Sequence, residues 1–286
     1  MSFTRAANEL NVTQTAVSHQ VRRLENELGI RLFHRFKERL ELTMSGQSYL
    51  QGVSLAFDQL RFSTEQLLEG CSNISLTIST LASFASKWLL PRLGSFRIAH
   101  PEIDIRVSAS TDFVDFVVGG ADTAIRYGHG EWKGLRSDRL MADEIFPVCS
   151  PKLLSGSAPL TSLDNLAHHS LLQVSGVTSD DWSTWLTAAG LPTNLISRAN
   201  LTFDLALMAV QAAVDGHGVC IGRRAYVEDD LKAGRLVAPF DMSVPVDRGF
   251  YLVSPPDLAN CGKVVALRNW LFDMIGNSEK MGSFAK

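Results

Sequence analysis

Polar and basic side chains near the N-terminus have the composition of a DNA-contacting surface. Within residues 13–28, apolar residues recur at Val17, Val21, Leu24 and Leu28, which is the spacing of one buried helix face. The other side of such a helix carries amide, hydroxyl, imidazole and guanidinium groups, which can hydrogen-bond base edges and phosphates. The residues predicted to contact DNA there are Gln14, Thr15, Ser18, His19 and Arg22.

A helix-turn-helix would position these side chains. The sequence predicts a short helix over Phe3–Leu10, a tight turn at Asn11-Val12 and a second helix over 13–28. Thr13 suits the N-cap because its hydroxyl can accept a backbone N–H, and Gly29 suits the C-terminal stop because glycine tolerates positive φ. In this motif the second helix enters the major groove.

A basic turn and a long helix follow. The runs Ile30–Phe33 and Leu40–Leu42 bracket a basic segment, which predicts a wing in which Arg35 contacts phosphates or the minor groove. From Thr43 a helix begins whose apolar spacing is that of a short heptad seam, predicting a dimerising coiled coil; the alternative is one helix packed on its own domain. The seam consists of Leu50, Val53, Phe57, Leu60, Thr64 and Leu67.

Composition limits the alternatives. The 286 residues are 45% apolar, enough for about two or three folding units. The formal net charge of −3 means that any DNA contact must be local. No run approaches the roughly 18 apolar residues of a membrane span, so no membrane partner is expected. Four scattered cysteines without a C-x-x-C pair predict reduced thiols in a cytoplasmic protein.

From residue 74 onward, strands alternate with helices. A strand from Ile74, a helix over 82–99 and a strand over 103–107 form a β-α-β unit, and the whole alternation predicts an open, largely parallel sheet. Further strands are expected at 123–126, 144–149, 196–201, 219–221 and 248–253, with helices near 180–189, 204–215, 223–232 and 262–275.

Ligands of such sheets bind at the C-terminal ends of strands, where helix N-termini offer free N–H groups. Ser79, Thr80 and Ser83 lie at one such junction and are predicted to bind an anionic or zwitterionic metabolite. Arg126 ends another strand and either donates to this ligand or pairs with an internal carboxylate. Tyr251 is read as a pocket wall, with a core position as the alternative.

No nucleophile elbow, zinc-protease, P-loop or EF-hand pattern occurs in the sequence. His168-His169 could bind a metal, but a surface loop is the better interpretation because no third ligand is near in sequence. We therefore expect neither an enzyme nor a metal or cofactor.

The first 46 residues contain the motifs Ser2-Phe3-Thr4-Arg5-Ala6-Ala7, Thr13-Gln14-Thr15-Ala16-Val17-Ser18-His19-Gln20-Val21, Leu24-Glu25, Leu28-Gly29, Leu32-Phe33-His34-Arg35 and Leu42-Thr43-Met44-Ser45-Gly46. In this order they resemble the DNA-binding half of LysR-type transcriptional regulators. In that family a further helix precedes these motifs, so we expect the first helix of the winged helix-turn-helix to be missing from this chain.

The resemblance continues through Trp88-Leu89-Leu90-Pro91-Arg92-Leu93, Ala124-Ile125-Arg126-Tyr127-Gly128 and Phe146-Pro147-Val148-Cys149-Ser150-Pro151. It points to the subgroup holding the glycine-cleavage activator and the β-lactamase-gene regulator. It implies a two-lobed α/β effector domain similar to periplasmic solute-binding proteins. The implied boundaries are a DNA-binding domain over 1–44, a linker helix over 45–72 and an effector domain over 73–286, with one lobe at about 74–147 and 248–276 and the other at about 148–247.

The resemblance implies a bacterial, homodimeric or homotetrameric regulator whose binding to double-stranded DNA is controlled by an effector, either an amino acid or a peptidoglycan fragment. The alternative is a cytosolic solute-binding or enzymatic α/β protein whose N-terminal helices only dimerise it. The polar face at Thr15, Ser18, His19 and Arg22 favours the regulator, because a dimerising helix has no need of it.

Overall fold

A computed structural model describes residues 2–36, 40–69, 74–110, 116, 120–155, 158–176, 178, 180–198 and 201–282. The chain divides into two compact units, Met1–Gly70 and Cys71–Lys286. A search of the described residues finds no helix with the length and hydrophobicity needed to cross a membrane.

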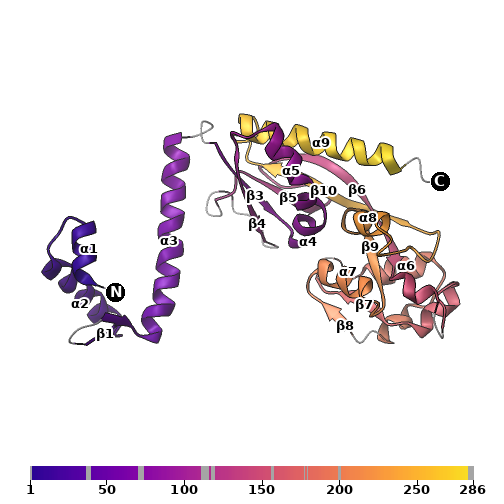
Figure 1. The fold of residues 1–286 in the computed structure, drawn as a ribbon, viewed down its shortest axis with the longest axis horizontal. Coiled ribbons are helices and arrows are strands. Elements are labelled where there is room, and N and C mark those ends of the chain that lie inside the picture. Colours follow the sequence, from indigo (N-terminus) through magenta and orange to yellow (C-terminus); the bar gives the residue numbers. More distant parts are fainter. Residues whose placement is uncertain are drawn as a thin grey trace. The chain divides into compact units, whose positions relative to one another are not determined.

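The first unit contains the predicted helix-turn-helix (Figure 1). Helix α1 spans Phe3–Glu9 and helix α2 spans Gln14–Leu28. The Thr13 hydroxyl accepts the Ala16 N–H at 3.2 Å, and Gly29 ends α2 with a φ of +67°. Both predicted caps are therefore confirmed. The apolar stripe of α2 is only half-buried at Val17, Val21 and Leu24, and Leu28 is 42% exposed.

The wing follows as an antiparallel pair, β1 (Phe33–Arg35) and β2 (Leu40–Leu42). A carboxylate oxygen of Glu25 on α2 accepts the N–H groups of Leu32 and Phe33 at 2.8 and 3.1 Å. This contact fixes the start of the wing to the helix, because one carboxylate oxygen of α2 accepts two backbone donors of the wing. Helix α3 then runs over Met44–Glu69.

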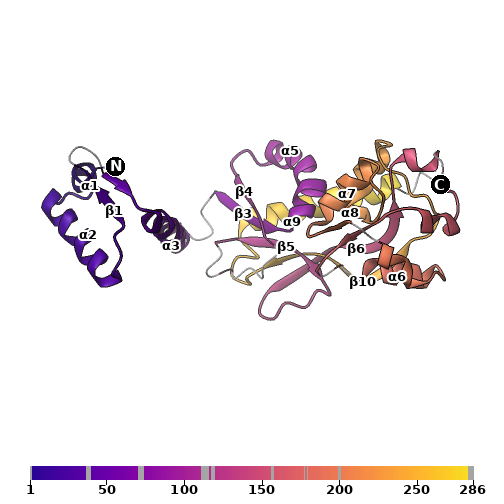
Figure 2. The ribbon, with the colours of Figure 1, turned by 90° about the horizontal axis from the view of Figure 1, so that it is seen from below.

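The second unit is built on one mixed sheet of eight strands in the order β4-β3-β5-β10-β6-β9-β7-β8. Strands β3, β4 and β5 are parallel and form one lobe, and β7, β8 and β9 are parallel and form the other. The long β6 and β10 are antiparallel to each other and pass between the lobes (Figures 1 and 2). The strands are β3 Ser75–Thr80, β4 Asp104–Ala109, β5 Thr123–Gly128, β6 Arg136–Val148, β7 Leu171–Val174, β8 Leu201–Phe203, β9 Val219–Arg223 and β10 Val244–Ser254.

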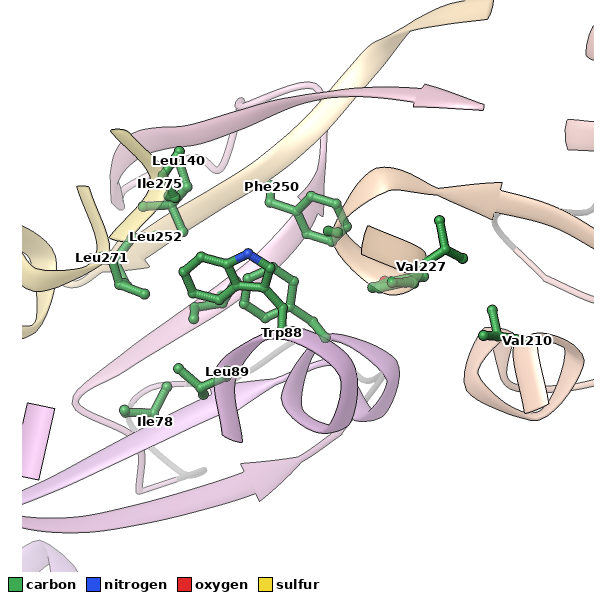
Figure 3. Packing of buried hydrophobic residues seen from close by; sticks show 14 of the residues in the cluster. Ile78, Trp88, Leu89, Leu140, Val210, Val227, Phe250, Leu252, Leu271 and Ile275 are labelled. Carbon is green, nitrogen blue, oxygen red and sulfur yellow. The ribbon is translucent and has the colours of Figure 1, made fainter. Parts of the chain in front are cut away.

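Helices cover this sheet. In the first lobe a helix predicted over 82–99 consists of α4 (Ala82–Phe84), a π-helical turn η2 (Ala85–Leu89) and α5 (Leu90–Ala99). Its Trp88 packs in the same core as Phe250 and the α9 residue Leu271 (Figure 3). The other helices are η3 Pro151–Leu154, η4 Leu163–His168, α6 Asp181–Ala188, η5 Thr193–Arg198, α7 Ala206–Val214, α8 Arg224–Lys232 and α9 Gly262–Gly282.

Three expectations for this unit are wrong. The sheet is mixed rather than largely parallel because both crossover strands run antiparallel to their neighbours. The strand predicted over 196–201 is wrong at its start, because residues 196–198 belong to the 3-10 helix η5, where Ile196 packs against the core around Trp185; Leu201 is in strand β8, and residues 199–200 lie outside the described part of the chain. A short apolar run cannot distinguish these outcomes. Cys261 is disulfide-bonded rather than reduced, whereas Cys149 and Cys220 are free thiols.

Candidate functional site

The predicted DNA-contacting residues of α2 form an accessible polar surface. Gln14, Thr15, His19 and Arg22 are exposed, and Ser18 is half-buried. Their side chains form no hydrogen bond or ion pair with another described residue, whereas the side chain of the neighbouring Arg23 pairs with Glu27 at 3.0 Å. These donors and acceptors are therefore available to a nucleic acid. The side chain of Arg35 lies outside the described part of the chain.

A cleft of about 480 Å³ opens between the two lobes of the second unit. It lies where parallel strands end, as expected for an α/β sheet. In the first lobe, the lining residues lie just after β3 and at the end of β5. In the second lobe, they lie just after β7 and β8 and at the end of β9. The lining includes Leu81, Ala82, Ser83, Arg126, Tyr127, Trp132, Val174, Ser175, Gly176, Thr178, Asp204, Leu205, Ala206, Arg223 and Tyr226.

The structure brings part of the predicted effector set to this cleft. Ser83 and Arg126 line it. Ser79 lies behind Arg126, whose Nη2 donates to the Ser79 hydroxyl at 2.7 Å, and burial lowers the pKa of Arg126. Thr80 is fully buried, and its Oγ1 has no hydrogen-bond partner.

Tyr251 does not line the cleft. It pairs with Arg126 across β10 and β5, but its ring packs edge-to-face on Trp132 at a centroid distance of 5.4 Å. Gly130, with a φ of +96°, makes room for it, because a Cβ there would lie 2.7 Å from the Tyr251 ring. The structure thus places Tyr251 behind the wall formed by Trp132.

Polar contacts join the lobes at the cleft and beside it. The Ser83 hydroxyl accepts the Leu207 N–H at 3.0 Å, which supplies α7 with a cap from the opposite lobe. Beside the cleft, Lys87 pairs with Asp230 at 3.0 Å. Arg92 donates two hydrogen bonds of 3.0 Å to Asp229. Rearranging the lobes would break these contacts, so ligand binding that moves one lobe must act against them.

A buried ion network lies at the inner end of the cleft. Arg223, 3% exposed, pairs with Asp143 on β6 and forms two hydrogen bonds of 2.7 Å with Asp181 on α6. The Tyr127 hydroxyl donates to Asp143 at 2.9 Å. The network therefore links β5 of the first lobe, the crossover strand β6 and two elements of the second lobe.

Burial dominates the acidity of these groups. It raises the pKa of Asp181 to about 6, even though Arg223 opposes the shift, and it also raises the pKa values of Asp143 and Tyr127. Burial acts to lower the pKa of Arg223, but Asp143 and Asp181 outweigh it and raise that pKa. Arg223 consequently stays charged and neutralises the carboxylates around it.

Sequence reasoning missed Arg223, Asp204 and Trp132 as cleft residues. Asp204 directly follows β8 and directly precedes Leu205, the N-cap of α7, so the rule that selected Ser79 and Ser83 could have selected it. The misplaced strand at 196–201 hid that junction. Among the described residues, no group of three or more His, Cys, Asp or Glu side chains could hold a metal ion.

Comparison with known proteins agrees with this architecture. Residues 1–47 match the bacterial regulatory helix-turn-helix protein of the LysR family, and residues 73–275 match the LysR substrate binding domain. The chain belongs to the LysR family of transcriptional regulators. The second match covers most of the unit that contains the cleft, which is therefore the effector-binding domain.

Curated relatives span nearly the full chain. The glycine cleavage system transcriptional activator of Escherichia coli (strain K12) is 42% identical over 271 residues, covering 95% of this chain and 88% of the relative. The HTH-type transcriptional activator AmpR of Pseudomonas aeruginosa is 36% identical over 274 residues, covering 96% and 90%. These relatives confirm the predicted family and its role in transcription regulation.

Solved structures support the two-lobed fold. The effector domain of AmpR from Pseudomonas aeruginosa superposes with a TM-score of 0.62 at 32% identity, covering 73% of this chain and 98% of that chain. CrgA of Neisseria meningitidis, at 24% identity, covers 96% of this chain and 94% of its own with a TM-score of 0.59. This second likeness concerns the fold alone.

Proposed function

We propose that this LysR-family chain binds promoter DNA through the exposed face of α2 and the wing, under the control of an effector held in the interlobe cleft. The observation that carries the proposal is the row of accessible, unpaired polar groups on the second helix of a winged helix-turn-helix. The proposed boundaries are 1–44 for DNA binding, 45–72 for the linker helix and 73–286 for the effector domain. The protein acts in the cytoplasm, where the DNA is, and without catalysis.

In this proposal Ser18 and His19 contact base edges, while Gln14, Thr15 and Arg22 contact phosphates or neighbouring bases. Ser18→Ala and His19→Ala should each weaken specific binding to the operator by about 1–3 kcal/mol, the value of a good base contact. Fluorescence anisotropy with an operator-containing promoter fragment and a scrambled fragment measures this specific component.

Asn26→Ala is the control, because Asn26 is an exposed residue at the far end of α2. It should leave operator affinity unchanged. Normal operator affinity in folded Ser18→Ala and His19→Ala variants would overturn the assignment of α2 as the reading helix.

The proposed effector is a small anionic or zwitterionic molecule, either an amino acid or a peptidoglycan fragment. The positions of Ser83 and Arg126 on the cleft support direct contacts. Ser79 orients Arg126, Tyr251 packs on Trp132 of the cleft wall, and Thr80 is fully buried. A coupling of about 1–3 kcal/mol between cleft and operator would change DNA affinity roughly 5–150-fold.

The chain is also proposed to form a homodimer or homotetramer through α3. Support comes from exposed apolar seam residues, with Leu50, Phe57 and Leu60 exposed by 43%, 67% and 61%. Such a surface is removed from water when two helices pair. Light scattering at micromolar concentration should give at least twice the chain mass, and a monomer would contradict the proposal.

A further inference from the structure

Glu25 joins helix α2 to the wing, although it is not among the residues predicted to contact DNA. It is half-buried and lies three residues after Arg22 on α2. Its Oε1 accepts the backbone N–H groups of Leu32 and Phe33 at 2.8 and 3.1 Å. Leu32 directly precedes β1, and Phe33 is the first residue of that strand. One carboxylate of α2 therefore holds the point at which the wing begins.

The start of α3 holds the same backbone segment. The Thr43 N–H donates to the Leu32 carbonyl at 2.9 Å, and the Thr43 hydroxyl donates to the Arg31 carbonyl at 2.7 Å. That hydroxyl also accepts the N–H of Gly46, in the first turn of α3, at 2.9 Å. A Cβ on Gly46 would lie 2.1 Å from the Leu32 carbonyl oxygen, so the helix and the segment are in close contact. Polar contacts from both α2 and α3 thus fix residues 31–33.

These polar contacts, more than packing, set the angle between α2 and the wing. Helix α2 has no buried residue, and the described wing ladder consists of three residue pairs. A two-stranded hairpin is marginally stable by itself, and apolar contacts are not directional. Hydrogen bonds to a carboxylate are directional and stronger than those to a neutral acceptor. The Glu25 contact therefore determines where the wing stands relative to α2.

We propose that Glu25 is a positioning residue for operator recognition. Together with Thr43 it holds residues 31–33 so that α2 and the wing engage DNA as one preformed unit. Ser18 and His19 can then reach base edges while Arg35 reaches the backbone or the minor groove. Contacts that are in place before binding do not have to be ordered during it, which favours the complex. This inference rests on the proposed function and adds to it a residue that acts through the wing.

Fluorescence anisotropy with operator and scrambled fragments gives the ratio of the two affinities for each variant of the full chain. Glu25→Ala should lower this ratio about tenfold, as the loss of one well-placed base contact does. Glu25→Gln keeps an Oε1 acceptor and should restore most of the ratio. The matched control is Glu27→Ala, because Glu27 carries the same charge on the same helix but is exposed and pairs with Arg23. It should leave the ratio unchanged.

A double variant separates positioning from a purely structural role. In the unaltered chain, Arg35→Ala should decrease the slope of log K against log salt by about one. In the Glu25→Ala background the wing is already displaced, so Arg35→Ala should change the slope much less. Thr43→Val is an independent disturbance, because it removes the hydroxyl that donates to Arg31 while keeping a similar shape. It should also lower the ratio of operator to scrambled affinity.

Three results would overturn the inference: a Glu25→Ala ratio equal to that of Glu27→Ala, an equal slope change for Arg35→Ala in both backgrounds, or an unchanged ratio in Thr43→Val. The third test stands even if circular dichroism shows that Glu25→Ala does not fold. Equal binding of operator and scrambled DNA by the unaltered chain would contradict the proposed function, and this inference with it. Normal discrimination by the unaltered chain together with any of the three results contradicts the inference alone.

Discussion

The DNA-binding face of α2 and the effector cleft differ in how they expose and pair their polar side chains. On α2 the functional side chains come from one helix, are exposed and lack partners within the described chain. In the cleft they come from the ends of several strands and helices, and the charged Arg223 and Asp143 are 3% and 5% exposed. A DNA surface exchanges water for phosphates and bases, whereas the cleft must hold its charges in place before the ligand arrives.

This difference predicts unequal sensitivity to mutation. Removing a polar group from α2 leaves nothing unsatisfied in the protein, so it should affect binding and not folding. Removing a buried charge leaves its partner without compensation, which is among the most costly changes available. The following experiments test that contrast, from the largest expected effect to the smallest.

Arg223→Met should be the most damaging change. It keeps the apolar part of the side chain but removes the partner of Asp143, whose side chain is fully buried, and of Asp181. Breaking a buried pair costs about 3–5 kcal/mol, so thermal denaturation should show a large loss of effector-domain stability.

Arg224→Met is the matched control, since the adjacent Arg224 pairs with Glu144 but its side chain is 60% exposed. A surface pair contributes about 0–1 kcal/mol. Similar melting of the two variants would mean that the Arg223 network is not the main stabilising contact.

Asp181 should make stability depend on pH. Its pKa rises from the usual 3.8 to about 6 on folding, so the folded state binds this proton more tightly than the unfolded chain. The stabilisation of the fold by the proton on Asp181 is complete below about pH 3.8 and is lost as the pH rises through about 6.

The unfolding free energy of the parent, relative to that of Asp181→Asn, should therefore be higher at pH 4 than at pH 7. This pH-dependent change should be on the order of 1–3 kcal/mol at most. Urea denaturation at both pH values measures it. A difference that does not vary with pH would show that Asp181 titrates normally.

Thr80→Val should stabilise the protein slightly. The Thr80 Oγ1 is buried without a hydrogen-bond partner, and replacing it with a methyl group removes that desolvation cost, about 1 kcal/mol. Ser79→Ala is the contrast, because it would deprive Arg126 of its 2.7 Å acceptor and should destabilise. A destabilised Thr80→Val variant in thermal denaturation would indicate that the hydroxyl has a partner in solution.

Arg35→Ala should have the mildest effect, confined to DNA binding. If Arg35 neutralises one phosphate, affinity should fall for all sequences and the slope of log K against log salt should decrease by about one. Anisotropy titrations over a salt series with specific and scrambled DNA measure both quantities. Lost specificity with an unchanged slope would show that Arg35 reads bases.

The helix-turn-helix could be predicted from sequence because its signals are local. The hydroxyl of Thr13 and the positive φ of Gly29 define α2 without reference to distant residues, and periodicity places Ser18 and His19 on its polar side. The β-α-β unit and its serine-rich junction were predictable for the same reason, since Ser83 lies just past the end of a strand.

Tertiary structure alone decided which junctions face one cleft. Tyr251 satisfies the same strand-end pattern as Arg126 but packs behind Trp132, and Thr80 lies in the core although Ser83, three residues on, lines the cleft. Asp143, Asp181 and Arg223 are far apart in sequence and meet because β6, α6 and β9 converge. Sequence patterns determine local conformation and the face of a helix or strand on which a residue lies. Burial and long-range pairing depend instead on the order of the strands within the sheet, and no local pattern encodes that order.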